Sequence, residues 1–161
     1  MQQPIHPGVS IGHIHLTVSD LERSLGFYRD LLGFEIVSRI NDTAVFLSAG
    51  GYHQHIALNT WAGRGATPPP SGHTGLFHFA ILFPSRSELA RTVKRLIEAQ
   101  YPLEGMADHE VSEAIYLRDP DENGVELYVD RPRETWRQTG DGLIAMGTRR
   151  LDLQDLLAQA Q

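Results

Sequence analysis

Residues 12–22, GHIHLTVSDLE, and residues 77–88, FHFAILFPSRSE, decide the fold of this chain because they begin two copies of one pattern. Each copy opens with alternating residues, which predicts a β-strand. Each strand is followed by a Ser-x-x-Glu capping box, which starts at Ser19 in the first copy and at Ser85 in the second and predicts the start of a helix. The repeat therefore predicts two modules of the same architecture.

The segments after each strand extend the repeat. Two amphipathic stripes predict the helices, Leu21, Leu25, Tyr28 and Leu32 in the first copy and Leu89, Val93, Leu96 and Ile97 in the second. Gly33 is expected to end the first helix, and the second is expected to end before Pro102. Three strands are then predicted in each copy, at 34–40, 44–48 and 52–60, and at 103–108, 114–118 and 125–129. The predicted order is βαβββ–βαβββ.

The length of 161 residues suits one domain. We divide it into module one at 11–61, a linker at 62–74, module two at 75–130 and a C-terminal tail at 131–161. The linker contains three consecutive prolines and cannot continue a sheet. The tail has a leucine-rich stretch at 151–157 that predicts a short helix, which either covers the domain or forms a dimer contact.

Composition excludes several classes of function. The net charge of −6 argues against nucleic acid or an anionic membrane as the main partner. The absence of cysteine excludes disulfides, thiolate metal sites and cysteine nucleophiles. The N-terminal residues lack the features of a secretory signal, and no apolar run approaches the roughly 20 residues of a spanning helix. We therefore expect a cytoplasmic protein.

Strand alternation places ligand-type side chains from both copies on one side. The apolar residues of each first strand take the helix side, so His13 and His15 in the first copy and His78 in the second face the other way. His13 and His78 are equivalent in the repeat. In the last strand, Glu126 lies on the inner face with Tyr128. Two imidazoles and a carboxylate fit a 2-His-1-carboxylate metal site, whereas each residue alone would be an ordinary strand side chain.

Longer segments resemble the glyoxalase, bleomycin-resistance and extradiol-dioxygenase superfamily, also called the vicinal oxygen chelate superfamily. The matching segments are 13–24, 27–28, 32–34, 75–80, 108–109, 111–117 and 119–128. Residues 50–61, 130–136 and 151–153 are similar to the catechol 2,3-dioxygenase-like branch. The resemblance covers roughly residues 11–160. It implies an α+β fold of two βαβββ modules, paired into a curved mixed β-sheet cup with the helices outside.

The resemblance also implies roles for individual residues. His13, His78 and Glu126 correspond to the metal ligands, and the spacing to the following aspartate favours His13 over His15 as the ligand from the first strand. Tyr116 matches the tyrosine that contacts substrate or dioxygen in ring-cleaving members. His109 resembles a supporting histidine of the same members.

The segment around Gln54 departs from the pattern of that branch, which tends to carry three consecutive histidines. His53 and His55 correspond to the acid–base group of ring-cleaving members and to the extra ligand of glyoxalases. Gln54 cannot transfer protons, so His55 is the first candidate for the acid–base residue and His53 the alternate. A glyoxalase would usually carry a carboxylate at position 55, which argues mildly against that activity.

The function that the resemblance implies is an extradiol-type ring cleavage of a catechol-like aromatic with O2. Fe(II) is the expected metal, with Mn(II), Ni(II) and Zn(II) as alternatives. Two other functions remain open: a glyoxalase-like isomerase or lyase, and a non-enzymatic protein that binds a small molecule. The intact ligand set argues against the binder. A homodimer is possible, since the cup either closes within one chain or pairs modules across two.

Overall fold

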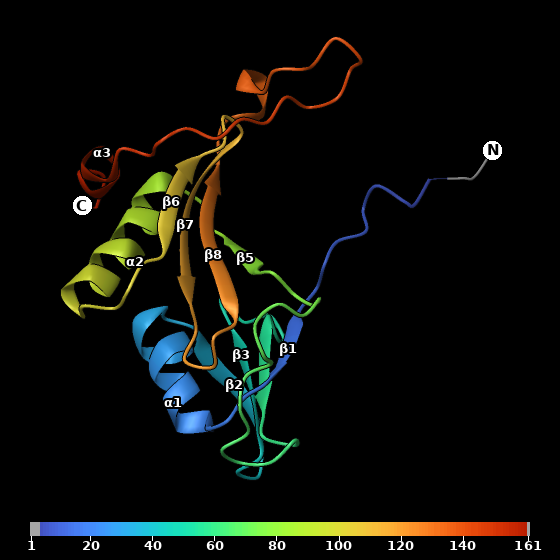
Figure 1. Cartoon of the computed structure of the whole chain (residues 1–161), viewed down its shortest axis with the longest axis vertical. Coiled ribbons are helices and arrows are strands. Elements are labelled where there is room, and N and C mark those ends of the chain that lie inside the picture. The colour runs from blue at the N-terminus through green and yellow to red at the C-terminus, as the bar shows by residue number, and fades with distance from the viewer. Residues whose placement is uncertain (1–3, 161) are drawn as a thin grey trace.

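The structure, a computed structural model, describes residues 4–160 as two four-stranded sheets with helices packed against them (Figure 1). The first half contains β1 (Ile14–Thr17), α1 (Leu21–Leu25), a π-helical segment (Gly26–Leu31), β2 (Glu35–Ile40), β3 (Ala44–Ser48) and β4 (Ile56–Asn59). The second half contains β5 (Phe79–Leu82), α2 (Arg86–Glu98), β6 (Gly105–Asp108), β7 (Ser112–Arg118) and β8 (Gly124–Asp130). A short 3-10 helix (Arg133–Thr135) and α3 (Leu153–Leu157) follow.

The two sheets have the same topology. Their strand orders are β1-β4-β3-β2 and β5-β8-β7-β6, and in each the first strand pairs in parallel with the last. The remaining pairs are antiparallel. The predicted α+β class and the βαβββ order of both modules are therefore confirmed. The sheets stay separate and are not closed into a barrel.

The helix starts differ in one respect from the prediction. Ser85 caps α2 as expected, because its side chain accepts from the backbone N–H of Glu88. The predicted cap at Ser19 is wrong: Asp20 caps α1 and accepts from the backbone N–H of Arg23 at 2.8 Å. Ser19 instead accepts a hydrogen bond from the guanidinium of Arg23. Serine and aspartate are both good N-cap residues. Because Ser19 and Asp20 are adjacent, the sequence alone did not distinguish which of them caps α1.

The predicted strands agree with the structure to within a few residues, except for the segment 52–60. Only Ile56–Asn59 forms β4, because pairing with β1 begins at Ile56. Two glycines with positive φ, Gly50 and Gly51, turn the chain before this point. As a result His53 and His55 precede the strand.

Both predicted helix stripes pack in one hydrophobic core between the helices and the sheets. Leu25 and Tyr28 from the first helical segment and Leu89 and Val93 from α2 are fully buried. Ile97 was wrongly included in the second stripe, since it is 40% exposed. Burial of one such large apolar side chain contributes about 1.5–3 kcal/mol to folding.

Polar contacts connect the two halves at the turn before β8. The Tyr28 hydroxyl donates to Asp119 at 2.7 Å, and Asp121 accepts from Arg23 at 2.5 Å. Burial, followed by the nearby Asp119 carboxylate, raises the pKa of Tyr28 well above its ordinary value. These contacts fix the first helix against the second module.

The predicted C-terminal helix is present as α3 and packs beside α2 (Figure 1). Leu156 is fully buried, and Arg86 of α2 donates to Asp155 at 2.7 Å. These contacts fit the predicted covering role. Within residues 4–160, none of the helices has the length and apolar character that a membrane span requires.

Candidate functional site

The centre of the candidate site is an imidazole and a carboxylate from adjacent strand positions. His78 immediately precedes β5, and Glu126 lies in β8, the strand that pairs with β5. His78 Nε2 lies 2.9 Å from Glu126 Oε2. Because Val125 and Leu127 point into the core, Glu126 points to the opposite face, as alternation predicted.

This pair fits a divalent metal ion by donor chemistry and by spacing. One imidazole nitrogen and one carboxylate oxygen suit Fe(II), Mn(II), Ni(II) and Zn(II). Neighbouring ligands that each lie about 2.1 Å from a metal are separated by roughly 3 Å, which matches the observed contact. His78 and Glu126 could therefore serve as two ligands of one ion.

Gly124 allows the close approach that brings His78 to Glu126. A Cβ atom built on Gly124 would lie 2.2 Å from the carbonyl oxygen of Phe77 and 3.0 Å from the Cβ of His78. Any other residue at this position would push the start of β5 away from β8. A shallow depression of about 240 Å³ opens here, lined in part by Phe77, His78, Tyr116 and Gly124.

Tyr116 and His109 extend the site along β7. Tyr116 lies opposite Glu126 in the β7–β8 ladder, and its hydroxyl is 3.3 Å from Glu126 Oε1 and 2.7 Å from His109 Nε2. Burial, followed by the negative charge of Glu126, raises the pKa of Tyr116 to about 12. Tyr116 therefore remains a neutral hydroxyl at physiological pH.

The C-terminal tail orients His109. Asp108 and Arg149 exchange backbone hydrogen bonds of 2.9 and 2.8 Å, which brings Gly147 next to His109. His109 Nδ1 lies 3.0 Å from the Gly147 carbonyl oxygen. Since a carbonyl only accepts, Nδ1 carries the proton, and Nε2 of the neutral ring accepts from the Tyr116 hydroxyl.

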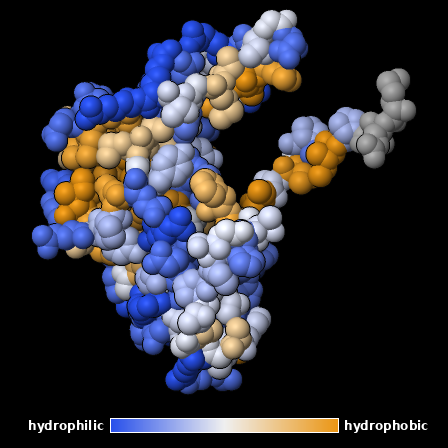
Figure 2. Space-filling model, in the orientation of Figure 1, coloured by the Kyte–Doolittle hydropathy of each residue, from blue (hydrophilic) through white to orange (hydrophobic). Residues whose placement is uncertain are grey.

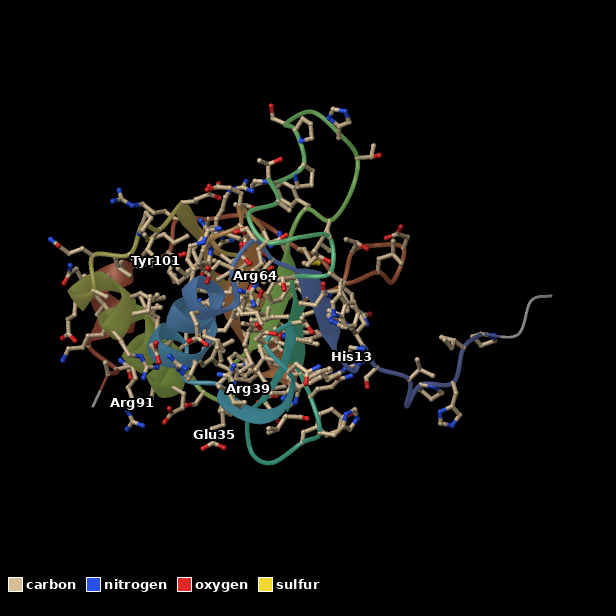
Figure 3. The ribbon with its side chains drawn as sticks, turned by 90° about the horizontal axis from the view of Figure 1, so that it is seen from below. His13, Glu35, Arg39, Arg64, Arg91 and Tyr101 are labelled. Carbon is tan, nitrogen blue, oxygen red and sulfur yellow. The ribbon has the colours of Figure 1, made fainter. Side chains whose placement is uncertain are left out.

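The structure does not bring His13 to this group. His13 is exposed at the base of the N-terminal arm, immediately before β1 (Figure 3). Among residues 4–160, no three His, Asp or Glu side chains lie close enough together to hold a metal. A single chain thus brings together His78, Glu126, Tyr116 and His109, but not His13.

His53 and His55 lie in the first module. His55 Nδ1 accepts from the backbone N–H of Ala49 at 3.2 Å, and its ring packs near Tyr52 with a centroid separation of 4.9 Å. The ring of His53 also packs on Tyr52, at 4.3 Å. These contacts place both histidines beside the turn between β3 and β4, apart from the group on the second sheet.

The sequence prediction gave no role to Asn59 and Trp61, which the structure joins to His15. Asn59 Nδ2 lies 3.0 Å from His15 Nε2, and Asn59 Oδ1 accepts from the backbone N–H of Trp61 at 2.9 Å. The ring of Trp61 lies edge-on to His15 at 5.2 Å. Strand alternation sets Asn59 on the face opposite Leu58, and this was the available signal.

The fold consists of two βαβββ modules, and one of its sheets carries a histidine–glutamate pair on its open face. These two features define the class of protein: a two-module α+β fold with a candidate metal centre. The sequence profile of the Glyoxalase/Bleomycin resistance protein/Dioxygenase superfamily matches residues 10–127. The chain therefore belongs to this superfamily.

Two curated relatives are dioxygenases by name. The chain is 43% identical over 156 residues to the catechol-2,3-dioxygenase of Bacillus subtilis, an alignment that covers 97% of this chain and 54% of the relative. It is 32% identical over 124 residues to biphenyl-2,3-diol 1,2-dioxygenase 3 of Rhodococcus globerulus, covering 74% of this chain and 63% of the relative. The chain thus spans between half and two thirds of the length of these two relatives.

Solved structures share the fold. A lactoylglutathione lyase from Agrobacterium tumefaciens is 27% identical, with a TM-score of 0.58 over 77% of this chain and 96% of that protein. A glyoxalase/dioxygenase from Nostoc punctiforme is 19% identical, with a TM-score of 0.66 over 82% of this chain and 99% of that protein.

Proposed function

We propose that this protein is a metal-dependent extradiol-type dioxygenase that cleaves a catechol-like aromatic ring with O2. The observation that carries the proposal is the contact chain from His78 through Glu126 and Tyr116 to His109, with separations of 2.9, 3.3 and 2.7 Å. The 43% identity to a catechol-2,3-dioxygenase over 156 residues supports it.

The metal would be held by His78 and Glu126 together with His13. We propose Fe(II), with Mn(II), Ni(II) and Zn(II) as alternatives. A manganese-dependent 2,3-dihydroxybiphenyl 1,2-dioxygenase from Geobacillus genomosp. 3 is 44% identical over 55 residues, which keeps Mn(II) in consideration. When bound, such an ion would act as a Lewis acid that favours the ionised form of a catechol hydroxyl.

The protein's own groups would position and protonate the reactants. Tyr116 is a neutral hydroxyl with one proton, which it gives to His109 Nε2 in the free protein; on substrate binding it would turn that proton towards an oxygen of the substrate or of O2. His109 holds that hydroxyl in place through the 2.7 Å contact. His55, with His53 as alternate, would reach the site on the same module as His13 and would exchange the proton of the catechol hydroxyl there.

A second copy of the chain would supply His13, so we propose a homodimer. Each chain carries His13 on module one (11–61) and the His78–Glu126 pair on module two (75–130). Because a two-fold interface repeats every contact, pairing module one of each copy with module two of the other creates two equivalent sites.

Exposed apolar residues next to both parts of the site support this assembly. Ile11, two residues before His13, is 97% exposed, and Phe77, next to His78, is 84% exposed. Figure 2 shows apolar surface on both sides of the hollow between the N-terminal arm and the loop that follows β8. In the segment between the 3-10 helix and α3, Leu143, Ile144 and Met146 are exposed. β1 and β5 are also edge strands of their sheets. Such surface is typical of a protein interface.

The test is metal analysis of anaerobically purified protein, followed by addition of catechol and then air. We expect about one metal ion per chain and an oxygen-dependent yellow product. His78→Ala should lose both, whereas His73→Ala, in the exposed linker, should lose neither. Protein that retains no metal would contradict the proposal.

A glyoxalase-like isomerase is the second candidate, because the lactoylglutathione lyase structure is 27% identical and shares the fold. This function would give stoichiometric metal, no ring cleavage, and conversion of a glutathione hemithioacetal in the absence of O2. That combination of results would replace the dioxygenase proposal.

A further inference from the structure

Asn59 has a single possible amide orientation. It is 4% exposed, and its Oδ1 faces the backbone nitrogen of Trp61 at 2.9 Å and the Thr17 hydroxyl at 3.3 Å. A backbone N–H can only donate, so the atom that faces Trp61 must be the amide oxygen. The amide nitrogen of Asn59 therefore faces His15.

The orientation of Asn59 determines where the imidazole of His15 carries its proton. Asn59 Nδ2, which can only donate, lies 3.0 Å from His15 Nε2. Nε2 must therefore be the acceptor, and the proton of the neutral ring is on Nδ1. Because the lone pair of Nε2 is already engaged, this contact also favours His13 over His15 as the metal ligand.

His15 presents its N–H group on the face of sheet one that carries His13. Leu16 and Val18 point into the core, so His15 and Thr17 point the other way, beside Ala57 and Asn59 of β4. The His15 side chain is exposed, and within residues 4–160 its Nδ1 contacts no acceptor. A donor of fixed direction is thus available to a ligand.

Two aromatic side chains flank this donor. The ring of Trp61 lies 5.2 Å from that of His15, and the ring of Phe46 lies 6.2 Å away. Trp61 is 62% exposed, although tryptophan is on average a largely buried residue. An aromatic wall next to a polar donor is the arrangement that recognises a flat ring with a polar substituent.

We propose that His15 is a specificity-determining residue whose Nδ1–H donates to an oxygen substituent on the aromatic substrate. The site would then favour catechols that carry an acceptor, such as an alkoxy or carboxylate oxygen, over catechols with an apolar group of similar size. The proposal rests on the proposed function, because it places the substrate against the face that carries His13.

The first measurement tests the hydrogen-bond arrangement without any turnover. Nitrogen-15 NMR of labelled, metal-free protein should show His15 protonated at Nδ1 and not at Nε2, with the resonances assigned by their loss in His15→Gln. In Asn59→Asp a carboxylate faces the ring, so Nε2 should become protonated. Protonation at Nε2 in the wild-type protein would overturn the proposal, whether or not the enzyme cleaves catechol.

The second measurement tests the substrate preference. Dissociation constants for 3-methoxycatechol and 3-methylcatechol are measured under anaerobic conditions with the metal-loaded protein. The wild type should bind the methoxy compound more tightly, and His15→Phe should reduce this preference about tenfold, the effect of one hydrogen bond. His15→Gln should keep part of it, because the amide oxygen can accept from Asn59 while the amide nitrogen donates to substrate.

The two readouts separate the possible failures. An unchanged binding preference in His15→Phe would exclude contact between His15 and the substrate even if the NMR result is as expected. If His15→Phe reduces the binding preference but the wild type cleaves no ring, the role of His15 in substrate binding is supported and the proposed reaction is contradicted.

Discussion

Glu126 is the residue through which the candidate site is organised, since His78 contacts one carboxylate oxygen and Tyr116 the other. His78 would hold the metal with it, whereas Tyr116 would act on the substrate oxygens. Substitutions at these two positions should therefore separate metal binding from chemistry.

Tyr116→Phe should keep the metal and lower the rate of ring cleavage. The variant retains the ring and removes only the hydroxyl, and loss of one positioned donor or proton-transfer group costs about 10²–10³ in kcat. Single-turnover kinetics and metal analysis on the same samples measure the two effects. Loss of metal together with activity would assign Tyr116 a structural role.

The pH dependence of the wild type should not include ionisation of Tyr116 below about pH 10. Its pKa is raised to about 12 by burial and by the adjacent Glu126 carboxylate, so the hydroxyl keeps its proton across the neutral range. A pH–rate profile from pH 6 to 10 should therefore have the same alkaline limb in the wild type and in Tyr116→Phe. A limb that disappears in the variant would contradict this assignment.

At the level of the strands, β5 and β8 must lie unusually close together where they meet at Gly124. Gly124→Ala should lose most of the bound metal, because the new Cβ would overlap the Phe77 carbonyl oxygen and displace His78. Gly75→Ala is the matched control, since its Cβ would meet nothing within 4 Å. Metal content and circular dichroism of both variants check the prediction. Full metal occupancy in Gly124→Ala would show that metal binding does not depend on the close approach of the chain to Gly124.

The contact between the first helical segment and the turn before β8 should make stability fall at high pH. Burial raises the pKa of Tyr28 well above 10.0, and it raises to about 12 the pKa of Tyr101, whose hydroxyl donates to the Arg118 carbonyl oxygen before the same turn. Above about pH 10 the unfolded chain loses these protons while the folded protein keeps them, so the free energy of unfolding decreases as pH rises. It should be unaffected by these groups below pH 10.

Tyr28→Phe tests this contact. It should weaken the decrease in stability between pH 10 and 12 and lower stability at neutral pH by about 1–2 kcal/mol, because Asp119 loses a buried hydrogen bond. Urea unfolding at pH 8, 10 and 11 provides both values. An identical pH dependence in the variant and the wild type would show that Tyr28 does not contribute.

At the level of the whole molecule, the separation of His13 from His78 determines whether the active unit is one chain or two. His13→Ala and His78→Ala should each be inactive alone. If subunits exchange in an equal mixture, half of the dimers contain one intact site, so about a quarter of the wild-type metal content and activity should return.

The same mixture distinguishes a shared site from a site within one chain. If one chain closed its own site, every chain in the mixture would lack a ligand and no activity would return. Size-exclusion chromatography of the wild type provides the independent control. A monomer that binds one metal would also contradict the dimer.

The sequence by itself determined the two modules, their βαβββ order and the face of β8 on which Glu126 lies. These features depend on periodicity and capping, which act over a few residues and leave direct traces in the sequence. The errors were of the same local kind: Ser19 in place of Asp20 as the cap, and a strand begun at Tyr52 instead of Ile56.

Only the tertiary structure decided which of these residues meet. The contact of Tyr116 with Glu126 follows from the register of β7 against β8, and that of His109 with Tyr116 depends on a tail that returns to β6. The amide of Asn59 and the ring of His15 come together from strands 44 positions apart in the sequence. The distance between His13 and His78 depends on how two modules pack, and long-range packing has no signature in local periodicity.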